Sequence, residues 1–344
     1  MNPQHWEILL KVIAGEKTEN KQVGFIIDSP WLPGWYNVTA LDYYTDSGIW
    51  YDANRKAAEE FPEVIFMPGF WSEYGMCTEP SAFGSKLVWT EENLPHPSMI
   101  INSHQDFGKL EKPDVTKDGL LPLALRRLVH YEDKIKSIGH HIRFAVSRGP
   151  LNIASFLMGT TDFMMALTLS PDDVHKGLTV ISDFIADWLN LQAETFQSID
   201  GILILDDMVG FLGEPDFKVY VLPYLKRIYD RFNVKVKFFH NDAEGLVCAP
   251  YLEEIGINLY NFSFNHSLGE MRKLAGNQVT LLGNIPPNGV LAAGSPDDIK
   301  KSVHNAMDSI DDHSRIIWSC GGGMPPGVST ENLNAFISAV RDNS

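Results

Sequence analysis

The sequence is short of cysteine, of positive charge and of long apolar stretches. Its 344 residues include 3 cysteines, too few for a disulfide scaffold, which predicts a protein of the reducing cytoplasm. Lys and Arg number 28 against 44 Asp and Glu, and the net charge of −16 opposes binding to nucleic acid. No uncharged apolar run reaches the roughly 18 residues of a membrane span, and charges interrupt the first apolar segment, so we expect neither a membrane anchor nor a secretory signal.

Short runs rich in Val, Ile and Phe recur along the chain, with helix-like segments between them. Several runs are almost continuously apolar, as is typical of parallel strands covered on both faces. We expect strands at Val23–Asp28, Val64–Met67, Ile142–Ser147, Gly201–Asp206, Lys235–His240, Ile257–Asn261, Val279–Asn284 and Arg315–Ser319. This alternation predicts an α/β fold, a (β/α)8 TIM barrel. An open doubly wound sheet with a small added domain is the alternative.

The segment between the second and third expected strands, residues 68–141, is longer than one helix requires. We expect it to hold extra helices and a small hairpin with Lys86–Thr90 and Ser98–Asn102 as its arms. Because no linker or low-complexity segment divides the chain, residues 1–344 are expected to form a single barrel domain with this insertion.

In a (β/α)8 barrel the chemistry lies at the carboxyl ends of the strands. His240 and Asp242 follow the fifth expected strand, where the two-residue period of a strand lets both side chains face the same way. Cys320 follows the eighth strand, across the barrel mouth. One imidazole, one carboxylate and one thiolate with a fourth position open predict a catalytic zinc site. A hydrogen-bonded histidine and a buried structural thiol are the alternative.

Two other strand ends carry charged residues. Asp206 and Asp207 are adjacent, so one of them is expected to face the mouth; we assign this position to Asp206, because it continues the strand. Asp206 could bind a substrate donor, act as a base or cap the next helix. Arg148 ends the third strand and could hold a carboxylate or phosphate, or form a surface salt bridge.

Aromatic residues gather after the first two strands. They could line a pocket for a flat or methoxylated ligand, or pack on one another as a lid. From this region and from the end of the seventh strand we expect four substrate-binding residues: Trp31, Tyr36, Trp71 and Asn284.

Several motifs resemble those of the uroporphyrinogen decarboxylase family. They are Gly149–Leu151 with Ala154, Leu205–Asp207, Val221–Lys226, Gly283–Ile285, and Gly323–Gly327 followed by Glu331 and Asn332. The resemblance extends over about residues 142 to 340 and implies a (β/α)8 barrel. True decarboxylases of the family carry an arginine-rich segment after the first strand and a histidine in the final loop. Here Asp28–Tyr36 contains no arginine and Gly322 stands in place of the histidine, which argues against decarboxylation of uroporphyrinogen.

The other branch of the family consists of zinc-dependent, corrinoid-linked methyltransferases, whose metal motif is H-x-C after the fifth strand and a cysteine in the final loop. His240 matches this histidine, Asp242 stands at the first cysteine, and Cys320 lies two positions before the second, which aligns with Gly322. Glu79 lies near a further family position and is expected to add an oxygen ligand. The resemblance implies methyl transfer between a small methylated substrate or thiol and the cobalt of a partner corrinoid protein, with zinc as the Lewis acid.

Two other functions remain open at this point. One is a metal-free decarboxylase in which Asp206 or Glu79 stabilises a developing cation and Arg148 holds a carboxylate. The other is a tetrapyrrole or corrinoid binder without activity, a reading motivated by the altered metal motif. The sequence predicts neither the methyl donor and acceptor nor the oligomeric state.

Overall fold

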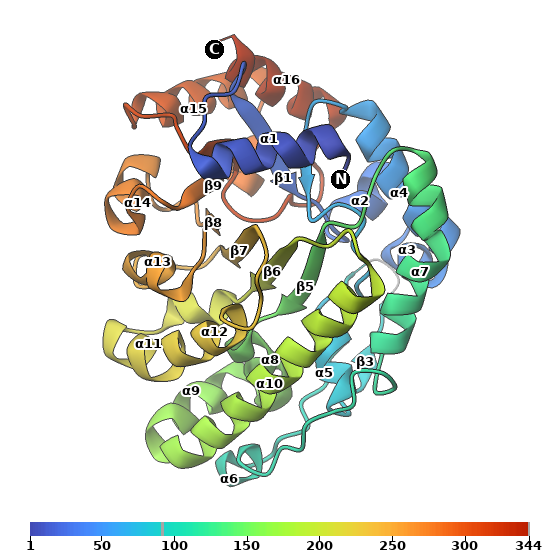
Figure 1. The fold of residues 1–344 in the computed structure, drawn as a ribbon, viewed down its shortest axis with the longest axis vertical. Coiled ribbons are helices and arrows are strands. Elements are labelled where there is room, and N and C mark those ends of the chain that lie inside the picture. The colour runs from blue at the N-terminus through green and yellow to red at the C-terminus, as the bar shows by residue number, and fades with distance from the viewer. Residues whose placement is uncertain (91–92, 343–344) are drawn as a thin grey trace.

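The computed structural model describes residues 1–90 and 93–342, and its centre is one sheet of eight parallel strands (Figure 1). The strand order is β2-β1-β10-β9-β8-β7-β6-β5, so neighbours in the sheet follow one another around a ring in chain order. A doubly wound sheet would instead reverse its order at a switch point. The strands are β1 (Gln22–Ile26), β2 (Ile65–Met67), β5 (Phe144–Arg148), β6 (Gly201–Leu205), β7 (Val236–Asn241), β8 (Leu259–Phe262), β9 (Thr280–Ile285) and β10 (Ile316–Cys320). Each overlaps a predicted strand, and the (β/α)8 barrel is confirmed.

Helices surround the sheet, and the first of them packs against the barrel interior (Figure 1). They are α1 (Pro3–Ala14), α2 (Leu32–Tyr36), α3 (Ala40–Thr45), α4 (Ser47–Glu60), α5 (Thr78–Ala82), α6 (His104–Phe107), α7 (Leu121–Ser137), α8 (Pro150–Met158), α9 (Thr160–Leu169), α10 (Pro171–Thr195), α11 (Glu214–Tyr220), α12 (Leu222–Tyr229), α13 (Leu252–Ile255), α14 (Leu268–Ala275), α15 (Pro296–Asp308) and α16 (Thr330–Arg341). Shorter helical turns are η1 (Asp207–Phe211), η2 (Ala249–Tyr251) and η3 (Pro287–Ala292). Within the described chain, no helix is both long and apolar enough to cross a bilayer.

Strand side chains alternate between two apolar cores. Phe25 and Ile27 pack between β1 and the outer helices, whereas Ile26 points into the barrel, as the two-residue period requires. The inner core also contains Trp6, Leu9 and other residues of α1. Helix α1 therefore packs against the barrel interior, and the polar strand ends lie at the carboxyl-terminal rim.

The segment between β2 and β5 contains α5, α6, α7 and an antiparallel pair, β3 (Leu87–Val88) with β4 (His96–Pro97). The segment thus holds extra helices and a hairpin, but the second arm lies two residues earlier than the predicted Ser98–Asn102. Of the predicted arm, Ser98 still pairs with the first arm, since its amide donates to the Lys86 carbonyl oxygen at 2.8 Å. The amides of Ile100 and Ile101 donate to the carbonyl oxygen of Leu157 at 2.8 and 3.0 Å, so the rest of this stretch is bonded to α8.

Candidate metal site at the barrel mouth

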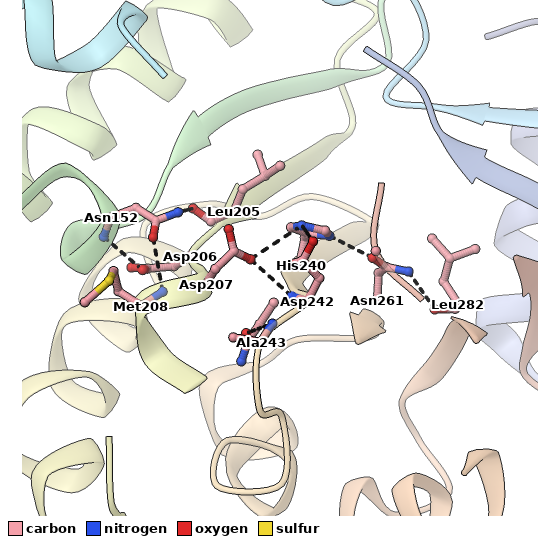
Figure 2. Close-up of polar contacts among 12 residues, drawn as sticks. Asn152, Leu205, Asp206, Asp207, Met208, His240, Asp242, Ala243, Asn261 and Leu282 are labelled. Atoms are coloured by element: carbon pink, nitrogen blue, oxygen red, sulfur yellow. Dashed lines mark hydrogen bonds and ion pairs between the residues drawn. The ribbon is translucent and has the colours of Figure 1, made fainter. Parts of the chain in front are cut away.

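The carboxyl ends of β6 and β7 bring two aspartates and a histidine together (Figure 2). Asp207, His240 and Asp242 each offer one ligand atom, and these atoms all lie within 4.8 Å of one another. The Nε2 atom of His240 is 3.6 Å from Asp207 Oδ1 and 3.9 Å from Asp242 Oδ2. We call these three residues the Asp–His–Asp group; it is the one such cluster found in the part of the chain that the structure describes.

Hydrogen bonds to Asn261 set the orientation of the His240 ring. The amide nitrogen of Asn261 donates to the carbonyl oxygens of Leu282 at 2.8 Å and Cys320 at 3.3 Å. Its amide oxygen must therefore face His240 Nδ1, 2.7 Å away, and accepts a hydrogen bond from the Nδ1–H group. With the proton on Nδ1, the lone pair of Nε2 points at the two carboxylates (Figure 2). A carbonyl-type acceptor behind the ring is the usual support of a metal-binding histidine.

The Asp–His–Asp group fits a divalent cation. Its three facing atoms are all electron-pair donors, and the 3.6 and 3.9 Å separations are longer than the roughly 3.2 Å limit of an ordinary N–H···O hydrogen bond. Burial and the neighbouring carboxylate of Asp207 raise the pKa of Asp242, and a cation between the two carboxylates would relieve their repulsion. One imidazole with two carboxylates is a suitable ligand set for zinc or another first-row divalent metal.

Asn261 gives a direct test of this arrangement. The Asn261→Leu variant removes the Nδ1 acceptor, and we expect metal affinity to fall about 10- to 100-fold. Asn261→Asp keeps an acceptor oxygen at the same place and is expected to bind metal more tightly than the leucine variant. Competition with a chromogenic chelator measures both. Equal affinity of the leucine variant and the wild-type protein would contradict the assigned tautomer.

Asp206 does not face the mouth, and the structure corrects its predicted place. Strand β6 ends one residue earlier and η1 begins at Asp207, so the alternation of the strand stops here. The carboxylate of Asp206 accepts the backbone N–H groups of Leu151 at 2.8 Å and Asn152 at 2.9 Å, at the start of α8. A Cβ at Gly149 would lie 2.3 Å from the same carboxylate, which explains a glycine there. Asp206 thus caps a helix, and Asp207 takes the position at the mouth.

Cys320 lies outside the Asp–His–Asp group. Its thiol is fully buried and directed at the carbonyl oxygens of Gly322, 3.5 Å away, and Gly323, 3.7 Å away. Burial raises the pKa of this thiol to about 12, which disfavours the thiolate that a metal needs. A Cβ at Gly322 would lie 3.1 Å from Asp242 Oδ2, so the backbone of Gly322 is what faces the group from the final loop. The cluster of possible ligand atoms in the described chain therefore contains Asp207 in place of the predicted Cys320.

Arg148 is buried and paired, unlike a surface residue. Its guanidinium lies 3.2 Å from Glu73 Oε2, and its backbone N–H donates to Glu79 Oε1 at 3.1 Å. Glu73 Oε1 also accepts the hydroxyl proton of Ser29. Burial raises the pKa of both Glu73 and Glu79. Glu79, predicted as an extra metal ligand, belongs to this Arg148 network.

Asp28, at the end of β1, joins the two parts of the mouth. Its Oδ1 atom is buried and has no hydrogen-bond partner among the residues described. Burial raises the pKa of Asp28 well above its usual range, and the negative charges of Glu73 and Asp242 act in the same direction, while Arg148 opposes them. The Arg148 network and the Asp–His–Asp group are thus close enough to interact electrostatically.

The predicted substrate-binding residues separate into two pairs. Trp71 lies at the mouth, with the guanidinium of Arg148 5.3 Å from its ring, and Asn284 donates from its side chain to the carbonyl oxygen of His266. Trp31 is fully buried, and its Nε1 donates to the carbonyl oxygen of Val328 at 2.9 Å, so it offers no surface to a ligand.

Tyr36 is the last residue of α2, and the ammonium group of Lys56 in α4 is 5.4 Å from its ring. The predicted substrate contact of Trp31 is corrected, because this side chain has no exposed surface. Tyr36 is half-buried, and its substrate contact stays a prediction.

The sequence interpretation did not assign roles to Asp207, Glu73, Asp28 and Asn261. A signal for Asn261 was available, because it ends the strand after that of His240 and adjacent parallel strands end side by side. For Glu73 no such signal existed, since it lies in a loop.

Comparison with known proteins identifies the family. The sequence model described as "Uroporphyrinogen decarboxylase (URO-D)" matches residues 68–343. The chain belongs to the uroporphyrinogen decarboxylase family. Among curated members of the family, the uroporphyrinogen decarboxylase of Chloroherpeton thalassium is 28% identical over 284 residues, which cover 77% of this chain and 76% of that protein. That of Azoarcus is 23% identical over 283 residues, with 78% and 75% covered.

Two solved structures share the fold of this chain. A methyltransferase from Methanosarcina mazei superposes with a TM-score of 0.81 over 97% of both chains at 17% sequence identity. A B12-independent methionine synthase from Shewanella superposes with a TM-score of 0.56 over 94% of this chain and 98% of that chain at 12% identity. The predicted membership of the uroporphyrinogen decarboxylase family is confirmed. At these low identities the two structural likenesses show the fold alone.

Proposed function

We propose that this member of the family is a metal-dependent methyltransferase that passes a methyl group between a small methylated substrate and the cobalt of a corrinoid partner protein. The observation that carries the proposal is the Asp–His–Asp group at the barrel mouth, with the lone pair of His240 Nε2 directed at Asp207 and Asp242. The fold of a methyltransferase with a TM-score of 0.81 supports it.

The residues that would hold the metal are Asp207, His240 and Asp242, with Asn261 holding the imidazole in place. A bound zinc ion would supply Lewis acidity to the methyl donor or to an acceptor thiol. Because two of the three ligands are carboxylates in place of thiolates, the site favours a harder metal and an oxygen or amine donor over a thiol. The buried Oδ1 of Asp28, without a partner among the described residues, suits a methyl donor that carries an N–H or O–H group.

The charges at the mouth are unfavourable for a substrate with many carboxylates. Asp28, Glu73 and Glu79 lie on one side, and the Asp–His–Asp group adds two more acids. Arg148, the cation in this network, is already paired with Glu73. A polyanion would therefore meet repulsion without a free arginine to bind it. This arrangement favours a neutral or cationic substrate.

A methyl-transfer assay tests the proposal. The purified protein is incubated with zinc, cob(I)alamin and, in separate reactions, methanol, anisole, dimethylamine or methanethiol, and methylation of cobalt is followed in the visible spectrum. We expect turnover with an oxygen or amine donor and its loss in His240→Ala, with His304→Ala, an exposed histidine of α15, as the matched control.

The same preparations are incubated with uroporphyrinogen. Conversion to coproporphyrinogen, unchanged by His240→Ala, would identify a metal-free decarboxylase and reject the proposal. Corrinoid or tetrapyrrole binding without any turnover would reject it in favour of a binding protein.

A further inference from the structure

A second concave site lies on the side of the barrel, away from the Asp–His–Asp group. It is a groove of about 500 Å³ between α3, the loop after β2, the end of β3 and one face of α7. Figure 1 shows α3, α7 and β3 grouped on this side of the molecule. A volume of this size suits a ligand of one or two rings.

One wall of the groove is aromatic and is formed by Tyr44, Tyr74 and Trp89. The rings of Tyr44 and Tyr74 are stacked with centroids 5.8 Å apart, and Trp89 meets Tyr44 edge-on at 5.8 Å. Tyr44 and Tyr74 are buried, whereas Trp89 is 38% exposed and Leu123, which also lines the groove, is 56% exposed. Large apolar side chains open to solvent in a concave surface mark it as a binding site rather than a packed core.

The other wall is basic and consists of Arg126, Arg127 and His130, all on α7. No acidic residue lines the groove among those that the structure describes. This is unusual in a chain with a net charge of −16. The groove thus combines flat ring surfaces with positive charge and favours an anionic ligand.

Arg127 is held by neutral groups among the described residues. It is 5% exposed, its Nη2 donates to the Tyr44 carbonyl oxygen and to the Tyr74 hydroxyl at 3.0 Å, and its Nε donates to Ser47 Oγ at 3.3 Å. Its guanidinium also lies over the rings of Tyr74, 4.7 Å from the centroid, and Trp50, 5.6 Å from the centroid. Within the described ranges 1–90 and 93–342, its Nη1 atom has no hydrogen-bond partner. Arg127 thus adds a buried positive charge behind the wall, and the planar fork of the exposed Arg126 matches a carboxylate.

We propose that this groove binds an aromatic carboxylate, with the ring against the aromatic wall and the carboxylate toward the basic wall. The inference does not depend on the proposed methyl transfer, because the groove shares no residue with the Asp–His–Asp group. It does adjoin the mouth, since the Tyr44 hydroxyl is 3.5 Å from Glu73 Oε1.

The test uses 2-naphthoate as the probe and titrates the full-length protein by calorimetry. Three analogues separate the contributions: 2-naphthamide lacks the charge, cyclohexanecarboxylate lacks the aromatic ring, and naphthyl phosphate carries a different anion. We expect one naphthoate site, at least tenfold weaker binding of naphthamide and cyclohexanecarboxylate, and weaker binding of the phosphate.

Variants locate the site. Arg127→Met removes a buried residue and could impair folding, so the deciding variants are the exposed Arg126→Met and Trp89→Ala. Each variant is expected to weaken naphthoate binding at least fivefold without changing the unfolding midpoint. The control is Arg231→Met, which replaces an exposed arginine after α12 and is expected to leave naphthoate affinity unchanged. Wild-type affinity in both deciding variants, equal binding of naphthoate and naphthamide, preference for the phosphate, or no binding at all would each overturn the proposal.

Discussion

Replacing either member of the Asp206-Asp207 pair is expected to give opposite results. Asp206→Ala leaves two buried N–H groups at the start of α8 without an acceptor, so we expect the free energy of unfolding to fall by about 3 kcal/mol. Asp207→Asn keeps an oxygen that can accept the Asp242 N–H but removes a carboxylate ligand. We expect stability to stay within about 0.5 kcal/mol and metal affinity to fall at least about 100-fold.

Urea unfolding measures the stability of both variants, and chelator competition measures their metal affinity. The roles of the two aspartates depend on the direction of each side chain. If Asp206→Ala lost metal at wild-type stability, or Asp207→Asn unfolded easily and kept its metal, the two aspartates would have the opposite roles to those described.

Arg148→Met is expected to destabilise the protein by about 3 to 5 kcal/mol near neutral pH. The substitution leaves Glu73 and Glu79 buried without their cation, and breaking a buried ion pair from one side has effects of this size. Arg227→Met, which breaks the exposed pair with Asp183, is the matched control and is expected to change stability by less than about 1 kcal/mol.

The loss of stability in Arg148→Met is expected to be larger at high pH than at low pH. Burial already holds the pKa of Glu73 and Glu79 above the unfolded value, and without Arg148 both rise further. The folded variant then binds more protons than the unfolded chain, so its stability falls as pH rises. Urea unfolding from pH 8 down toward the ordinary glutamate pKa of about 4.3 should show the deficit shrinking. A deficit that grows on acidification would contradict the buried acidic network.

The barrel was predictable because its strands are buried on both faces. Their apolar runs stand out from the helices, and all eight predicted strands overlap observed ones. His240 and Asp242 were also predictable as neighbours, since both follow the period of one strand. The role of Asp207 was not predicted, because the two-residue period was assumed to continue beyond Leu205. Strand β6 ends there, and a helical turn begins at Asp207.

Other parts of the site depend on contacts between distant segments. The partner of Arg148 is Glu73, 75 residues away in a loop, so the sequence alone could not separate a buried ion pair from a surface one. Trp31 and Trp71 belong to one aromatic-rich region, yet Trp31 is buried against Val328 while Trp71 lies beside Arg148. Periodicity along the chain cannot distinguish such cases, because the fold of a loop decides them.

Metal analysis of the purified protein tests the central claim most directly. Wild-type protein, His240→Ala and Cys320→Ser are loaded with zinc, passed through a desalting column and measured by mass spectrometry. The structure predicts about one zinc per chain in the wild-type protein and in Cys320→Ser, and less than about a tenth of that in His240→Ala. Zinc retained in His240→Ala, or lost from a folded Cys320→Ser, would contradict a metal site built from Asp207, His240 and Asp242.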